Sequence, residues 1–291
     1  MFTGKYSIKD LERLTGIKAH TIRIWEQRYG IVQPLRSNTG IREYDDNELK
    51  KILKISYLNK QGFKISKLAG LNETQLSDLI HDTDVTDNYS FALIDQLIAS
   101  MMQLDEQSAN KIINESIDDK GFEFTFEELF LPVLHQTGQL WQAGTIEPAR
   151  EHFISGIIEH FLQVQIASTP KVLSKFRVIL LQLPGDLHEI SLMYIHYLLR
   201  KNGIPVLYLG VSVPPEDLKS IIGNRNDVKI YIHTVLNTND LFVKNLEKLI
   251  EVAGQNKIYI SGKAVHEIQN QSIIKIETLQ HLKQLIQDNS I

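Results

Sequence analysis

From about residue 175 the chain alternates between short β-branched runs and helical stretches. The runs cover residues 177–183, 205–209, 228–233, 257–260 and 273–276, and the helical stretches cover 189–202, 215–223, 239–254, 263–270 and 278–288. Strands that alternate with helices in this way are joined by right-handed crossovers into a parallel sheet with helices on both faces. The alternation therefore predicts a C-terminal α/β domain.

A short polar segment follows the first of these runs. Residues 183–188 read Leu-Pro-Gly-Asp-Leu-His and lie between an expected buried strand and an expected helix, where parallel sheets hold their ligands. An imidazole there can bind a metal through one ring nitrogen while a carboxylate holds the other, and Asp186 stands two residues before His188. A solvated turn is the alternative reading of a lone Asp-x-His. No glycine-rich phosphate loop follows the run, which argues against a nucleotide ligand.

The middle of the chain has helical periodicity. Four apolar stripes between about residues 90 and 167 predict a four-helix unit, and Pro132 falls inside the third stripe, where a proline is tolerated or kinks the helix. The connection between the third and fourth helices carries Trp141 and, ten residues later, Glu151 and His152. Taken alone, these are a core aromatic residue and an ordinary helix start.

Charge is distributed unevenly along the chain. Residues 1–69 hold 14 Lys/Arg and 7 Asp/Glu, whereas the other residues hold 17 and 28, so a net charge of +7 precedes a net charge of −11. A compact basic unit on an acidic body is typical of a nucleic-acid-binding domain.

Composition excludes several classes of site. The chain has no cysteine, which rules out a disulfide framework, Cys-ligated zinc, iron–sulfur clusters and thiol catalysis. The N-terminus has no apolar signal core and no run reaches 18 apolar residues, so we expect a cytoplasmic protein with no membrane partner.

The basic region has the pattern of a winged helix-turn-helix. Ser7 is a suitable N-cap for a helix that ends at Gly16, and a second helix over about 19–29 places Ile22 and Trp25 inward and basic residues outward. Such a second helix enters the major groove of DNA. Two short extended pieces around residues 33–44 then predict a wing, with Arg36 and Arg42 on its two arms beside the phosphate backbone.

Several motifs here resemble the MerR family of bacterial transcription regulators over residues 4–72: Tyr6-Ser7-Ile8, Gly16-Ile17, Thr21-Ile22-Arg23-Ile24-Trp25-Glu26 and Gly40-Ile41-Arg42-Glu43-Tyr44-Asp45. The resemblance implies binding to double-stranded operator DNA as a dimer or tetramer. The residues expected to contact DNA are Lys18, His20, Thr21, Arg23, Arg28, Arg36, Asn38, Arg42 and Tyr44.

The spacing Trp-x9-Glu-His resembles the helical cap of cobalamin-binding MerR-type regulators, which include light-sensing carotenogenesis repressors. In that family the Trp lies against the corrin and the Glu and His contact its upper ligand, which implies these roles for Trp141, Glu151 and His152. The region from about 175 to 290 resembles the flavodoxin-like cobalamin-binding fold. This resemblance implies that His188 binds cobalt and that Asp186 is its partner.

Three departures from the family pattern follow. Ser191 replaces a glycine of Asp-x-His-x-x-Gly, Thr234 begins the family's Ser-x-Leu, which ends here at Leu236, and Ser261 replaces the first glycine of the Gly-Gly that ends here at Gly262. All three add atoms where the family uses small side chains. Gln142 stands where light-sensing members have a histidine, which argues against a light response.

We therefore predict a multidomain protein. The expected parts are a winged helix-turn-helix over 1–72, a linker over 73–89, a four-helix cobalamin cap over 90–170 and a flavodoxin-like cobalamin-binding domain over 171–291. The predicted function is non-enzymatic control of transcription by cobalamin held between the cap and the α/β domain. One alternative is the same regulator with a degenerate, cofactor-free sensor; a more remote one is a cobalamin-carrying methyl-transfer component.

Overall fold

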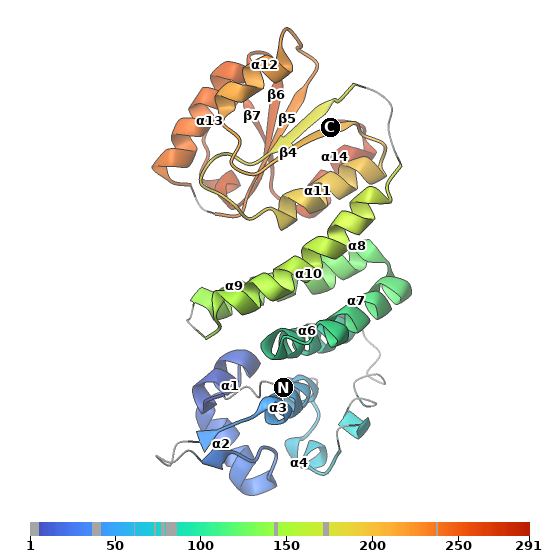
Figure 1. Ribbon diagram of the computed structural model, residues 1–291, viewed down its shortest axis with the longest axis vertical. Helices are drawn as coiled ribbons and strands as arrows, with labels where there is room; N and C mark the ends of the chain where they lie inside the picture. Colours follow the sequence, from blue (N-terminus) through green and yellow to red (C-terminus); the bar gives the residue numbers. More distant parts are fainter. Residues whose placement is uncertain are drawn as a thin grey trace. The chain divides into compact units, whose positions relative to one another are not determined.

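The computed structural model describes residues 6–36, 42–60, 62–72, 74–76, 79, 86–142, 145–170, 175–236 and 238–291 (Figure 1). The chain divides into two units, Met1–Ile158 and Glu159–Ile291, which are described separately. Part of the predicted linker over 73–89 lies outside the described residues, and a helix already begins at residue 86. No helix among the described residues is long and apolar enough to cross a membrane.

The first unit begins with the predicted winged helix-turn-helix. Its helices are α1 (Ile8–Thr15), α2 (Ala19–Tyr29), α3 (Asp46–Lys60) and α4 (Ile65–Leu68), and its wing strands β1 (Leu35–Arg36) and β2 (Arg42–Glu43) pair antiparallel. Ser7 caps α1 through a capping box with Asp10, and Gly16 ends the helix with a left-handed backbone. Helices α1 and α2 contact each other, and Leu11, Ile22 and Trp25 on them are buried.

The bundle of the first unit follows the four predicted stripes. It contains α6 (Thr86–Gln103), α7 (Glu106–Lys120), a third helix and α10 (Pro148–Ala167), whose last residues belong to the second unit. The third helix is built from α8 (Phe122–Phe124), a π-helical stretch η1 (Thr125–Phe130) and α9 (Leu131–Gln142). The π-helical stretch ends next to Pro132, which has no backbone N–H to offer an α-helical turn. Helix α3 packs against α6, so the winged domain and the bundle share one unit.

The second unit is the predicted parallel α/β domain. Five strands, β3 (Val178–Leu181), β4 (Val206–Gly210), β5 (Lys229–Thr234), β6 (Lys257–Gly262) and β7 (Ile273–Ile276), pair in the order β4-β3-β5-β6-β7. Every pair is parallel. This is the flavodoxin-like order, with the switch of direction at β3.

Helices cover both faces of this sheet. Figure 1 shows α12 (Leu218–Ile222) and α13 (Asp240–Ala253) over one face and α11 (Ile190–Lys201) and α14 (Leu279–Gln287) by the other. Alternation along the strands sends Ile230 and Ile232 into the core beneath α12 and α13, so that Tyr231 and His233 point to the opposite face.

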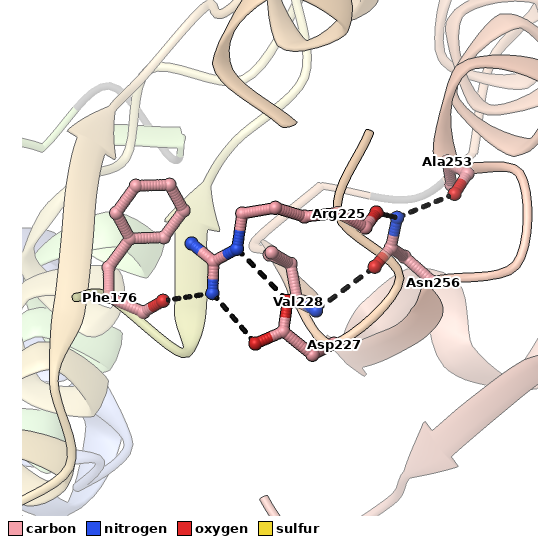
Figure 2. A network of polar contacts seen from close by, with 6 residues as sticks. All are labelled: Phe176, Arg225, Asp227, Val228, Ala253 and Asn256. Atoms are coloured by element: carbon pink, nitrogen blue, oxygen red, sulfur yellow. Dashed lines mark hydrogen bonds and ion pairs between the residues drawn. The ribbon is translucent and has the colours of Figure 1, made fainter. Parts of the chain in front are cut away.

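The amino ends of the strands are fastened by a polar network (Figure 2). The Arg225 guanidinium donates to both carboxylate oxygens of Asp227 at 2.9 and 3.0 Å and to the carbonyl of Phe176 at 2.9 Å. Asn256 accepts from the Val228 amide at 3.0 Å and donates to the Arg225 carbonyl at 2.8 Å. The starts of β3, β5 and β6 are therefore tied together, and the loops at the opposite ends of the strands are where ligands bind.

One predicted helix is much shorter than expected. The sequence predicted a helix over residues 263–270, but the structure has a single short 3₁₀ segment, η3 (Lys263–His266). Its start is fixed by Gly262, whose backbone φ of 93° is accessible to glycine and rarely to other residues. The 3₁₀ segment ends at His266, and residues 267–272 lead to β7 without helical structure.

Candidate functional site

The outward face of α2 carries the predicted DNA-contacting residues. Lys18 is the N-cap residue, and its ammonium forms an ion pair with Glu12 at 3.3 Å. His20, Arg23 and Arg28 are exposed on the helix, and the half-buried Thr21 has its hydroxyl 3.3 Å from His20 Nε2. His20, Arg23 and Arg28 are thus exposed on one helix, as expected of a helix that enters the major groove and contacts phosphates.

The wing is held to α2 by one carboxylate. Glu26 accepts from Arg42 Nε, with both carboxylate oxygens at 3.2 Å, and from the Tyr44 hydroxyl at 3.3 Å. Tyr44 is buried, and burial together with the nearby Glu26 charge raises the pKa of its hydroxyl to about 12. Arg42 and Tyr44, predicted as DNA contacts, therefore position the wing in this structure.

Part of the wing lies outside the residues that the structure describes. The backbone of Arg36 pairs with Arg42 in the two-stranded sheet, but its side chain is not among the described ones. Asn38 lies outside the described residues altogether, as does the side chain of Gln142. The DNA contacts predicted for Arg36 and Asn38 stay predictions.

In the second unit, Asp186 and His188 meet on the loop between β3 and α11. The Asp186 Oδ1 atom lies 2.9 Å from His188 Nδ1 and accepts from the His188 amide at 3.1 Å. The other oxygen, Oδ2, accepts from the amides of Val235 at 2.7 Å and Leu236 at 3.2 Å. The Asp186 side chain is 8% exposed and that of His188 is 56% exposed, so the loop presents the imidazole outward from a buried support.

Electrostatics fix the roles of this pair. Burial acts to raise the pKa of the Asp186 carboxyl, but hydrogen bonds from His188, Val235 and Leu236 outweigh it and lower that pKa to about 2. An ionised carboxylate can only accept, so His188 Nδ1 donates to it, and in the neutral imidazole the lone pair is then on Nε2. A histidine oriented in this way by a carboxylate is suited to bind a metal through Nε2. The structure thus brings the predicted pair of Asp186 and His188 together, and binding of cobalt by His188 stays a prediction.

The residues at the ends of β5 and β6 form a second group. Thr234 and Ser261 are buried, and the Thr234 hydroxyl donates to the Ser261 carbonyl at 3.3 Å and accepts from the Ala264 amide at 3.0 Å. Gly262 lies so close to Thr234 that an added Cβ would be 1.9 Å from its carbonyl oxygen. The glycine kept at Gly262 is therefore required by the approach of the two strands.

Two residues in this region escaped prediction from the sequence. The hydroxyl of buried Tyr231 donates to Ser261 Oγ at 3.0 Å, and His233 Nδ1 lies 2.8 Å from the same atom. Burial lowers the pKa of His233 to about 4, against the opposing effect of the Asp186 charge, so His233 is neutral at pH 7. The sequence could have indicated both residues, because Tyr231 and His233 are two residues apart in the otherwise apolar β5 and so face the same side of the sheet.

The other predicted cofactor residues are distributed over both units. Ser191 is half-buried in the first turn of α11, and Leu236 is 40% exposed after β5. In the first unit, Trp141 lies near the end of α9 and is 49% exposed. Glu151 and His152 lie in the first turns of α10, and the Glu151 Oε2 atom is 2.7 Å from His152 Nδ1. The cofactor contacts expected from these residues stay predictions.

Two family descriptions match the chain. Residues 6–74 match "MerR HTH family regulatory protein", and residues 93–164 match "B12 binding domain". The first match covers the winged domain, and the second covers the helices that carry Trp141, Glu151 and His152.

Two curated bacterial proteins are similar over most of the chain. "HTH-type transcriptional repressor CarH" of Myxococcus xanthus is 27% identical over 232 residues, which is 76% of this chain and 76% of that protein. "HTH-type transcriptional repressor CarA" of the same organism is 24% identical over 264 residues, 89% of this chain and 87% of that protein.

A solved structure supports the fold. The monomethylamine corrinoid protein of Methanosarcina barkeri covers 70% of this chain and 97% of its own length, with a TM-score of 0.51 and 14% identity. The chain therefore carries a MerR-type helix-turn-helix region followed by a B12-binding domain, and it is homologous to the CarH and CarA repressors.

Proposed function

We propose that this protein regulates transcription by binding operator DNA through its winged domain, under the control of cobalamin bound through His188. The observation that carries the proposal is the Asp186–His188 pair, whose geometry is that of an oriented metal-binding imidazole, on a corrinoid-protein fold in a chain with a MerR-type head. The relatives CarH and CarA are transcriptional repressors, which supports the same class of function here.

The chain's own residues have distinct parts in this function. His188 Nε2 would bind cobalt, Asp186 would keep the imidazole in the required tautomer, and the exposed face of α2 would enter the major groove. Bound cobalamin would supply a cobalt ion that can exchange ligands. Regulation needs no catalysis, because a ligand shifts a conformational or oligomeric equilibrium by its different affinities for the two states.

Oligomer formation is part of the proposal. A MerR-type head reads one half of a pseudo-palindromic site, so two heads with fixed spacing are needed for tight binding. We propose that the regulator acts as a dimer or tetramer and that cobalamin changes the proportion of the species that binds DNA.

The direct test is co-elution of a corrinoid with the full-length protein. Purified protein is mixed in the dark with adenosyl-, methyl- or hydroxocobalamin, desalted, and its absorbance spectrum is recorded beside a His188→Ala variant. We expect at least one form to co-elute near one equivalent with the wild-type protein and to be lost from the variant. Colourless wild-type protein with all three forms would sink the cofactor proposal and would favour a cofactor-free sensor.

A further inference from the structure

The solvent-facing side of α2 contains an exposed aliphatic side chain. Ile22 and Trp25 are buried and define the inward side of the helix. Ile24, in contrast, is 43% exposed, and it shares a face with His20, four residues before it, and Gln27, three residues after it. Both of these polar neighbours are exposed as well. An isoleucine therefore lies within the polar stripe that α2 presents to solvent.

The position of Ile24 on α2 is that of a residue facing base edges. The exposed Arg23 and Arg28 lie on the two sides of the stripe and suit phosphate groups, which position a helix without specifying a sequence. The N-terminal residues of a recognition helix contact the bases, and Ile24 lies within the first two turns of α2. When α2 enters the major groove, the Ile24 side chain thus faces the bases.

Folding gives little reason for an isoleucine at this position. A β-branched side chain has a lower helix propensity than alanine, and nearly half of the Ile24 surface stays in contact with water. A single exposed apolar residue is common on protein surfaces, so exposure alone assigns it no role. What distinguishes Ile24 is its place among the side chains that face the groove.

The chemistry of the major groove limits what this side chain can contact. Thymine presents a C5-methyl group there, whereas the other base edges are distinguished by hydrogen-bond donors and acceptors. An isoleucine side chain has no polar atom, so against those groups it would displace water without replacing the lost hydrogen bonds. Against the methyl group it buries apolar surface on both partners, which favours binding.

We propose that Ile24 recognises a thymine in each half of the operator by contact with the C5-methyl group of that base. This inference rests on the proposed binding of operator DNA through α2, and it adds the base that one residue selects. Ile24 is then a specificity residue, whereas Arg23 and Arg28 contribute affinity for DNA of any sequence.

The test removes single methyl groups from the DNA. Each thymine of the duplex selected by the wild-type protein is replaced in turn, in both half-sites, by deoxyuridine, which lacks only the C5-methyl group. Binding of the full-length protein is measured by fluorescence anisotropy in the dark, with or without adenosylcobalamin, whichever gives the tighter complex. One buried methyl group corresponds to about threefold in affinity, so we expect one symmetric pair of replacements to weaken binding by about tenfold.

Three variants assign that loss to one side chain. Ile24→Ala should bind the original duplex about tenfold more weakly and should lose no further affinity when deoxyuridine stands at the sensitive position. Ile24→Val keeps two methyl groups and should still distinguish thymine from deoxyuridine. The matched control is Val164→Ala, which truncates a similarly exposed β-branched residue on α10, 47% exposed, and should behave as the wild-type protein does.

The salt dependence of binding separates a base contact from a disturbed helix. Ile24→Ala removes no phosphate contact, so its affinity should fall with salt as steeply as that of the wild-type protein. A shallower slope would show that the variant disturbs the docking of α2 and would overturn the inference.

The remaining outcomes distinguish this inference from the proposed function. A duplex with no position sensitive to deoxyuridine, or a loss that persists in Ile24→Ala, would overturn the role of Ile24 and leave the proposed function intact. Wild-type protein that binds the selected duplex no better than unrelated DNA would overturn both.

Discussion

Asp186 is a buried acid whose charge is stabilised by hydrogen bonds from a side chain and three backbone amides. It connects the β3–α11 loop to the end of β5, so it supports the fold as well as the imidazole. Its effect on stability can be separated from its effect on ligand binding, because the lowered pKa of Asp186 makes stability depend on pH even when no cofactor is present.

Replacement of this acid by Asn should destabilise the protein in a pH-dependent way. The pKa of Asp186 is lowered from 3.8 to about 2, so between these values the unfolded chain binds more protons than the folded one. The shift corresponds to about 2 kcal/mol of stability, fully present above about pH 5 and lost as the pH falls toward 2. Urea unfolding followed by circular dichroism should therefore show a deficit of Asp186→Asn at pH 6 that narrows by pH 3.

The matched control for this prediction is Asp288→Asn, which changes an exposed carboxylate after α14 in the same unit. Its unfolding midpoint should follow that of the wild-type protein at both pH values. A deficit of Asp186→Asn that is the same at pH 3 as at pH 6 would show that Asp186 is not ionised with a lowered pKa in the folded protein.

Among the elements, the wing and α2 depend on one another. Glu26 joins them through Arg42 and Tyr44, and its own side chain is 16% exposed. Glu26→Ala should release the wing and weaken binding to a DNA duplex selected by the wild-type protein by about tenfold. The variant should still fold, because a half-buried ion pair of this kind contributes only about 1 kcal/mol to the free energy of unfolding. Fluorescence anisotropy of a labelled duplex measures the affinity.

Two further variants test this explanation. Glu26→Gln keeps an acceptor for Arg42 and should restore part of the affinity, whereas Glu106→Gln, on the exposed surface of α7, should change nothing. Unchanged DNA binding by the folded Glu26→Ala protein would mean that the wing does not need this anchor.

The elements themselves were largely predictable. The short β-branched runs predicted the five strands and the apolar stripes predicted the bundle helices, because apolar side chains must be buried against another element. Contacts between distant residues were not predictable in the same way. Glu26 is an ordinary polar residue in the sequence, and its role follows from where the chain places β2 beside α2.

In the candidate site too, local features were predictable from the sequence and contacts between distant residues were not. Spacing predicted the pair of Asp186 and His188, because a turn of two residues can be read from the sequence. The link from Asp186 to the amides after β5 spans 49 and 50 residues, and it depends on the pairing of β3 with β5. The polar chain through Tyr231, Ser261 and His233 likewise needs the register of β5 against β6, which places His233 opposite Ser261.

For the whole molecule, the uneven distribution of charge fits the proposed roles of binding DNA with one part and a ligand with the other. The net positive charge of residues 1–69 would attract the phosphate backbone, and the net negative charge of the remainder would be repelled by DNA. Control by a ligand then needs only a coupling free energy between ligand binding and DNA binding, and a tenfold change in DNA affinity corresponds to about 1.4 kcal/mol.

The most direct test of this account is the affinity of the full-length protein for its selected DNA duplex, measured in the dark with and without adenosylcobalamin. The same titration is repeated with His188→Ala. We expect the dissociation constant of the wild-type protein to change by about tenfold or more when the corrinoid is bound, and that of the variant to stay the same. Equal DNA affinity of wild-type protein with and without corrinoid, under conditions where absorbance shows the corrinoid bound, would contradict control by cobalamin.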